Sequence, residues 1–129
     1  MKSPAWIKVT YWIAAFYDGL LGLIFLIGMG KIFAVAQVDP PNHPAYIQFP
    51  AMILIIFAYL FYNIARKPIE NRNLIIYGVL IKLAYCASVI PHWVAGQMPS
   101  MWIPFAVFDF IFMLIFIYTV VVLKKLASQ

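Results

Sequence analysis

The stretch LIIYGVLIKLAYCASVIPHW, from Leu74 to Trp93, is apolar over nearly its whole length and carries one lysine, Lys82, near its middle. An α-helix rises about 1.5 Å per residue, so a run of this length covers the roughly 30 Å hydrocarbon core of a bilayer. A lysine at the centre of such a helix costs about 2.5–3.5 kcal/mol on insertion scales. We therefore predict a membrane-spanning helix whose lysine needs an acidic partner elsewhere in the chain.

The composition of the whole chain also indicates a membrane protein. Of the 129 residues, 66% are hydrophobic and 10% are charged, whereas soluble domains are about half apolar and roughly a quarter charged. The net charge is +5, but the basic residues do not form the clustered face that a nucleic-acid-binding surface needs. We expect one domain in a lipid bilayer, in a bacterial inner (plasma) membrane, and no nucleic-acid partner.

Three further apolar runs are long enough to cross a bilayer. The sequence predicts four transmembrane helices, at about 9–33, 47–65, 74–93 and 102–123. The connections between them are short and contain prolines, which oppose helical continuation. Short connections join antiparallel neighbours. We therefore expect an all-α protein, an up-down-up-down antiparallel four-helix bundle.

The basic residues predict how the bundle is oriented. In this topology one lysine, Lys31, lies on one side of the membrane, and the basic residues outside the helix centres gather on the other: Lys2, Lys8, Arg66, Lys67, Arg72, Lys124 and Lys125. The positive-inside rule then predicts that both termini are cytoplasmic. The sequence AVAQ at 34–37 has the form of a signal-peptidase site, but the apolar run before it is too long for a signal peptide. We expect the first helix to be uncleaved.

Two of the four acidic residues, Asp18 and Asp109, lie inside predicted membrane helices. Asp18 follows Lys8 by about ten residues, and Lys82 follows Arg72 by about ten, so both groups lie roughly 15 Å into the membrane. The depth of Asp109 differs from that of Lys82 by a few ångströms, within reach of a long side chain. The three charges are therefore predicted to face one another.

Helical spacing places small or polar residues beside each charge. The faces that we expect to point inward are Ala14, Asp18 and Gly22 in the first helix, Gly78, Lys82, Tyr85 and Cys86 in the third, and Ala106, Asp109 and Met113 in the fourth. In the second helix Tyr59 and Asn63 share a face. We predict a buried polar or ligand-binding cluster of Asp18, Lys82, Asp109, Tyr85 and Asn63, with Tyr59 beside it. Such a cluster is either functional or serves only to fix the register of the helices.

Two histidines fall on the predicted outer side, His43 in PPNHPAY and His92 in VIPHW. Together with Trp93 they are the outer-face candidates, and His92 is a candidate proton-carrying group at the mouth of the cluster. Their setting among prolines and tryptophan is more typical of loop and interfacial residues than of metal ligands. We expect no metal site, and nothing in the sequence identifies a cofactor. The familiar catalytic motifs are absent.

The segment YDGLLGLIFLIGMGKIF, at 17–33, resembles the opening of the DoxX-like family of small four-helix membrane proteins. The likeness rests on a glycine-punctuated first helix that ends in the pair Gly30 and Lys31, although Asp18 stands where many such proteins have a basic residue. The resemblance implies a four-helix fold and an accessory role in membrane redox or respiratory complexes. The segment FYDGLLGLIFLI and the proline-rich loop after it also resemble the EXPERA-type proteins, which include sterol isomerases and sterol-binding relatives.

Three hypotheses for function follow from these observations. The first is a bundle that binds a lipophilic small molecule or a membrane partner protein, as an accessory subunit of a complex. The second is a proton- or ion-linked transporter or channel subunit, which in so small a bundle would act as a homo-oligomer. The third is a lipid-modifying membrane enzyme with Asp109 or His92 as the acid–base group.

Overall fold

The computed structural model describes residues 2–129, which are helical apart from short connections. Its elements are α1 (Ala5–Ala36), α2 (Ala45–Arg66), η1 (Arg72–Leu74), α3 (Ile75–Val94), η2 (Ser100–Trp102) and α4 (Ile103–Ala127). The four α-helices, two of them extended by the adjoining 3₁₀ turns, are each long and apolar enough to cross a membrane. The predicted fold class, an all-α protein with four transmembrane helices, is confirmed.

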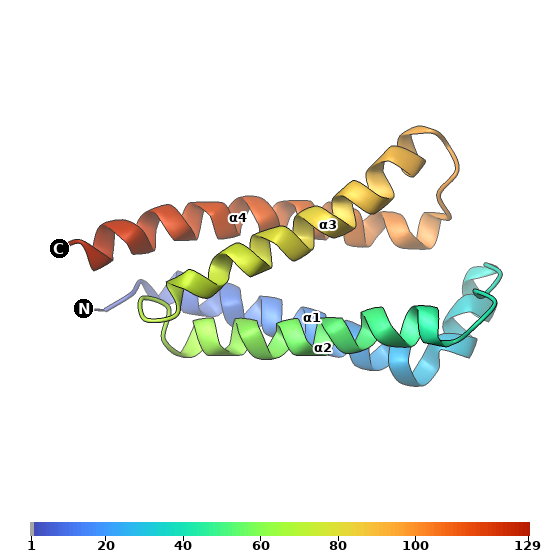
Figure 1. Ribbon diagram of the computed structural model, residues 1–129, viewed down its shortest axis with the longest axis horizontal. Coiled ribbons are helices and arrows are strands. Elements are labelled where there is room, and N and C mark those ends of the chain that lie inside the picture. Colours follow the sequence, from blue (N-terminus) through green and yellow to red (C-terminus); the bar gives the residue numbers. More distant parts are fainter. Residues whose placement is uncertain (1) are drawn as a thin grey trace.

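The helices form two hairpins, α1 with α2 and α3 with α4 (Figure 1). The α3 helix leans away from the α1–α2 hairpin toward its own C-terminal end. Both chain termini lie at the opposite end of the molecule. We call the end with the termini the inner end, and the end with the connections 37–44 and 95–99 the outer end. The two hairpins thus diverge from the inner end toward the outer end.

Three of the helices, α1, α2 and α4, are longer than their apolar runs predict. The α1 helix begins at Ala5 rather than near residue 9, and α4 continues to Ala127 rather than ending near residue 123. Hydropathy marks the part of a helix that lies in hydrocarbon, whereas backbone hydrogen bonding continues into the polar interface. The α1 helix also contains a kink at Gly28, where φ is −108° and ψ is 17°. Sequence pattern alone does not reveal such a kink.

The α1 and α2 helices approach closely where α1 has no side chain. A Cβ atom on Gly22 would lie 2.6 Å from the backbone oxygen of Ala51, and one on Gly19 would lie 3.3 Å from Cβ of Ala58. Small residues at a membrane helix interface let the two backbones come near and increase van der Waals contact. Gly22, from the predicted small-residue face of α1, therefore contacts α2 together with Gly19, which is not on that face.

The core that joins the two hairpins lies toward the inner end. The Tyr11 ring stacks on Phe116 with centroids 4.9 Å apart, and Phe61 lies 5.2 Å from Phe116. All three side chains are fully buried. Ile7 and Leu123 extend the same core toward the inner end. Side chains from both hairpins fill this half of the bundle.

A buried hydrogen bond reinforces this core. The Tyr11 hydroxyl lies 2.6 Å from Oγ1 of Thr119, and the Thr119 hydroxyl donates to the Phe116 carbonyl at 2.7 Å. Tyr11 is therefore the donor to Thr119. We expect Tyr11→Phe to lower the free energy of unfolding by about 0.5–1.5 kcal/mol, measured by denaturant titration in micelles. Tyr59→Phe, on an exposed side chain, is the control; equal losses in the two variants would contradict the assignment.

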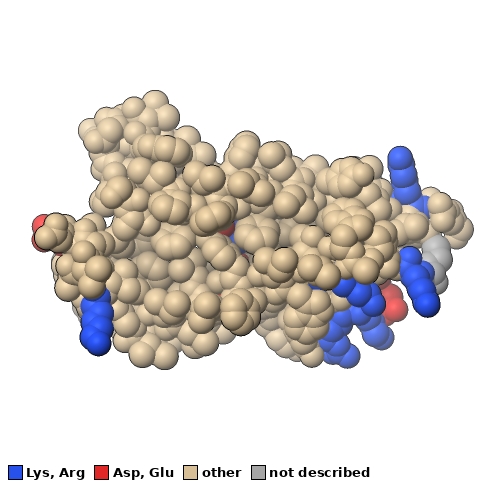
Figure 2. All heavy atoms as spheres, turned by 180° about the vertical axis from the view of Figure 1, so that it is seen from behind, with Lys and Arg blue, Asp and Glu red and all other residues tan. Residues whose placement is uncertain are grey.

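The charges divide between the two ends as the topology predicts. Figure 2 shows lysine and arginine side chains gathered at the inner end, one such side chain at the outer end, and a broad middle band almost free of surface charge. The residue at the outer end is Lys31, and one further lysine, Lys82, is buried. The uncharged middle band is what a membrane-spanning surface requires.

Candidate functional site: a buried charge cluster beside an apolar cavity

Lys82 bridges the two aspartates inside the bundle. Its Nζ donates to Oδ1 of Asp18 at 2.7 Å and to Oδ1 of Asp109 at 3.1 Å. The side chains of Lys82, Asp18 and Asp109 are 1%, 1% and 11% exposed. The predicted meeting of these three charges is confirmed. We call the three residues the charge cluster.

The charge cluster also ties the two hairpins together. Asp18 lies on α1, whereas Lys82 and Asp109 lie on α3 and α4. Inside a bilayer each charge would be costly to leave alone, and charge-assisted hydrogen bonds are stronger than neutral ones. The bond between Lys82 and Asp18 therefore holds together two hairpins whose outer halves diverge.

Three aromatic rings surround the ammonium group of Lys82. Its Nζ lies 5.5 Å from the ring centroid of Tyr17, 5.7 Å from that of Phe61 and 5.3 Å from that of Phe112. A cation within about 6 Å of an aromatic face is attracted by the ring quadrupole. The rings leave the two aspartates as the hydrogen-bonding partners of Lys82.

Small residues let the helices come close enough for these contacts. A Cβ on Gly78, one turn before Lys82, would lie 2.6 Å from Cε1 of Phe61. The thiol of Cys86, one turn after Lys82, lies 3.5 Å from the Ala106 carbonyl. The residues on the predicted inward faces are buried, apart from Tyr85 and Met113, which are half-buried.

One oxygen of the charge cluster has no donor. Oδ2 of Asp18 is buried and accepts no hydrogen bond from residues 2–129. Lys82 donates to the other oxygen of this carboxylate. Buried polar atoms are nearly always hydrogen-bonded, so an exception calls for a physical explanation. The hydroxyl of Tyr17, whose ring lies beside Lys82, is likewise buried without a hydrogen-bond partner among the described residues, so both an acceptor and a hydroxyl are unpaired at the charge cluster.

A cavity of about 350 Å³ begins at the charge cluster and extends toward the outer end. The lining comes from all four helices, and apart from the charge cluster, Tyr85 and Ser88 its side chains are apolar. Ligand-binding cavities are usually about 300–1,000 Å³ and mostly apolar, with a few polar groups. The size and lining of this cavity fit that description.

The cavity is closed between α1 and α4 by aromatic packing. Phe25 stacks on Trp102 with centroids 5.5 Å apart and meets Phe105 edge-on at 6.2 Å. The lining residues on the side of α2 and α3 include several exposed ones, among them Phe49 and Ala84. The mouth of the cavity therefore lies between the diverging outer halves of α2 and α3, on the flank of the bundle.

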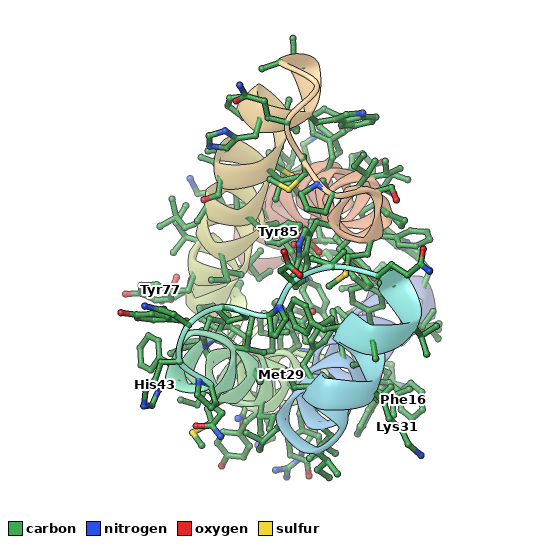
Figure 3. All side chains as sticks on the ribbon, turned by 90° about the vertical axis from the view of Figure 1, so that its right-hand side faces the viewer. Phe16, Met29, Lys31, His43, Tyr77 and Tyr85 are labelled. Atoms are coloured by element: carbon green, nitrogen blue, oxygen red, sulfur yellow. The ribbon has the colours of Figure 1, made fainter. Side chains whose placement is uncertain are left out.

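Tyr85 lies in the space between the two hairpins. Figure 3, a view from the outer end, shows Tyr85 between the hairpins, while Phe16, His43 and Tyr77 lie at the periphery. The Tyr85 hydroxyl donates to the Trp102 carbonyl at 2.9 Å and so fixes α3 against η2. Tyr85 lines the cavity with the charge cluster but makes no hydrogen bond to it.

Comparison with known proteins adds no assignment. Neither a scan against protein-family models nor searches of curated proteins and of solved structures give a match for this chain. The resemblances to the DoxX-like and EXPERA-type families stay predictions. The function has to be inferred from the charge cluster and its cavity.

Two residues predicted beside the charge cluster are elsewhere. Tyr59 is 68% exposed on the outside of α2. Nδ2 of Asn63 donates to the backbone carbonyl of Tyr59 at 2.9 Å. The backbone carbonyl of Asn63 accepts from Nδ2 of Asn71 at 2.7 Å. Asn63 therefore stabilises the end of α2 and its connection to η1. The shared face of Tyr59 and Asn63 was a correct inference from spacing, but that face does not point to the charges.

The three outer-face candidates are separate from the cavity. Nδ1 of His43 accepts from the backbone N–H of Ala45 at 3.1 Å, which satisfies a donor at the start of α2. His92 and Trp93 lie in the last turn of α3 with exposed side chains. None of the three lines the cavity. A proton path from His92 to the charge cluster therefore has no support in this arrangement.

Sequence reasoning missed the apolar half of the site. Phe25, Leu54, Trp102 and Phe105 line the cavity, yet none was singled out as a candidate. In a membrane protein both lipid-facing and inward-facing residues are apolar, so hydrophobic periodicity does not separate them. The nearest signal was the position of Phe25, about two turns after Asp18 on α1.

Proposed function

We propose that this protein is a small integral membrane bundle that binds a lipophilic molecule with one polar end. The apolar part of the ligand occupies the cavity between the hairpins, and its polar end reaches the charge cluster. The observation that carries this proposal is an apolar cavity of ligand size that is bordered by the charge cluster, whose Asp109 side chain is 11% exposed. We orient the inner end toward the cytoplasm, following the positive-inside rule.

The position of the mouth supports a ligand that arrives from the bilayer. The mouth lies on the flank of the bundle, beside exposed apolar side chains such as Phe49. A lipophilic molecule partitions into the bilayer and can enter sideways without crossing water. The aromatic core around Tyr11, Phe61 and Phe116 closes the inner half, so this arrangement suits binding from one side.

The proposal predicts where a lipophilic probe will attach. A photoactivatable diazirine derivative of dodecanol, incorporated in phosphatidylcholine nanodiscs with the protein, should label peptides containing residues 47–54 and 81–88 above all others. Both segments line the cavity, and the probe is enriched there relative to lipid-facing helix surfaces. Peptide mass spectrometry measures the distribution. Even labelling over all exposed apolar faces would refute a ligand cavity.

A matched pair of alanines tests the mouth. Ala84 and Ala87 are both exposed on α3, and of the two only Ala84 lines the cavity. We expect Ala84→Phe to obstruct the mouth and reduce labelling of the cavity by about tenfold or more. A loss of about 1.4 kcal/mol in binding free energy already weakens binding tenfold. Ala87→Phe should leave it unchanged. Similar labelling in the two variants would mean that the mouth is not between α2 and α3.

Transport is a second candidate, favoured by the position of the charge cluster. The cluster lies where the sealed inner half meets the open outer half, as a binding site with one-sided access would. Transport additionally requires a state in which the core between Tyr11, Phe61 and Phe116 opens. Coupled flux in proteoliposomes under a pH gradient, lost in Ala84→Phe but kept in Ala87→Phe, would support this candidate. For the enzyme hypothesis, in which Asp109 or His92 is the acid–base group, Asp109 lines the cavity and His92 does not.

A further inference from the structure

We propose that the ligand is a lipophilic amine, bound with its protonated nitrogen at the charge cluster, where Asp109 is the partly exposed carboxylate. This inference rests on the proposed binding function and adds the chemical class of the polar end. It follows from the charges, the hydrogen bonds and the lining of one cavity.

Charge balance in the cluster favours a cation. The cluster contains two acidic groups, Asp18 and Asp109, and one basic group, Lys82, so with all three ionised it is one positive charge short. No other charged residue lines the cavity. In a low-dielectric site an unbalanced charge is costly. A monovalent cation in the cavity restores the balance, whereas an anion doubles the deficit.

The hydrogen-bonding capacity of the cluster favours a donor. Asp109 lines the cavity with a side chain that is 11% exposed, and an ionised carboxylate accepts hydrogen bonds but donates none. Lys82 directs hydrogen bonds to both aspartates and is otherwise surrounded by rings. Two of the three N–H donors of Lys82 are thus used by the aspartates, and Asp109 presents an acceptor to the cavity. A carboxylate or phosphate at this position would face carboxylate oxygen.

The aromatic lining of the cavity also suits an organic cation. Phe25, Tyr85, Trp102 and Phe105 all border the cavity. Aromatic rings attract organic cations through their quadrupoles, and tryptophan and tyrosine do so most strongly. The same rings provide apolar contact for a hydrocarbon tail. A neutral alcohol would use the acceptor and the apolar walls, but an amine would also use the charge deficit and the rings.

Competition against the photoactivatable dodecanol probe tests this class. Protein in phosphatidylcholine nanodiscs is labelled in the presence of dodecylamine, dodecanol or dodecanoate, which share one chain length and differ in the polar end. We expect dodecylamine to halve cavity labelling at a concentration about 10- to 100-fold below that of dodecanol, as a charge-assisted hydrogen bond would give. Dodecanoate should compete least.

Asp18→Asn is the decisive variant, because it removes the charge deficit but keeps the shape of the side chain. Lys82 retains its bond to Asp109, and the denaturation midpoint checks that the variant is folded. We expect the preference for amine over alcohol, measured as the ratio of their half-maximal competing concentrations within this variant, to fall to about threefold or less. Asp39→Asn removes the same charge from an exposed loop residue and should keep the full preference.

The outcomes separate the two proposals. If the dodecanol probe labels the cavity but dodecanoate competes as well as dodecylamine, the amine inference is wrong and the binding function stands. The amine inference is also wrong if Asp18→Asn keeps the full preference for amine. If the probe does not label the cavity in the unaltered protein, the binding function itself fails.

Discussion

Replacing Lys82 with methionine is expected to lower the free energy of unfolding by about 3–5 kcal/mol, the usual cost of breaking a buried ion pair by removing one partner. The substitution keeps the length of the side chain and removes its charge. Asp18 and Asp109 would then remain buried with no counter-charge and without the donor that satisfies one oxygen of each. Reversible unfolding in mixed micelles, followed by circular dichroism, measures the loss.

The cause of that loss can be separated from packing. In the triple variant Asp18→Asn, Lys82→Met, Asp109→Asn the charges are gone while the side-chain volumes are nearly kept, so most of the stability should return. If the triple variant is as unstable as Lys82→Met alone, the lysine acts through its packing and the electrostatic account fails.

An exposed ion pair provides the control. Lys67 lies 3.4 Å from Glu70, with side chains that are 59% and 69% exposed. Exposed pairs of this kind contribute about 0–1 kcal/mol. Lys67→Met should therefore change stability by less than about 1 kcal/mol. A loss as large as that in Lys82→Met would mean that the contribution of the charge cluster to stability does not depend on its burial.

The charge cluster could be predicted from sequence because the membrane penalises isolated charge. One lysine and two aspartates lay at similar depths on three different helices, and mutual pairing was the least costly arrangement. The helical rise and the basic residues at the helix ends were enough to place the three groups at one depth. Asp18, Lys82 and Asp109 could thus be identified without any knowledge of how the hairpins pack.

The cavity could not be predicted in this way. It exists because α3 leans away from α2 toward the outer end, and the angle between helices depends on contacts along their whole length. Tyr59 and Asn63 show the same limit: spacing put them on one face of α2, but the direction of that face depended on how α2 rotates against α1. The close contact between Gly22 and Ala51 sets that rotation. Gly22 can be identified as a contact residue only once Ala51 is known to lie against it.

Filling that contact should have the second large effect. In Gly22→Leu the new Cβ would lie 2.6 Å from the Ala51 backbone oxygen, and 3.0 and 3.2 Å from atoms of Ile55 and Leu54. A helix backbone has no flexible end that can move aside, so α1 and α2 must separate. We expect a loss of about 3 kcal/mol in the free energy of unfolding, at the upper end of typical overpacking costs. Gly30→Leu, with nothing within 4 Å of its Cβ position, is the matched control on the same helix.

The binding function predicts that Gly22→Leu will also impair the cavity, even where the variant is folded. Ala51 and Leu54 line the cavity from α2, while Asp18, one turn before Gly22, lines it from α1. Separating the two helices moves the apolar wall away from the carboxylate. Cavity labelling by the dodecanol probe should therefore fall with stability in Gly22→Leu, whereas Ala84→Phe should lose labelling without losing stability. If Gly22→Leu is destabilised but labels like the unaltered protein, the α1–α2 contact supports the fold without shaping the cavity.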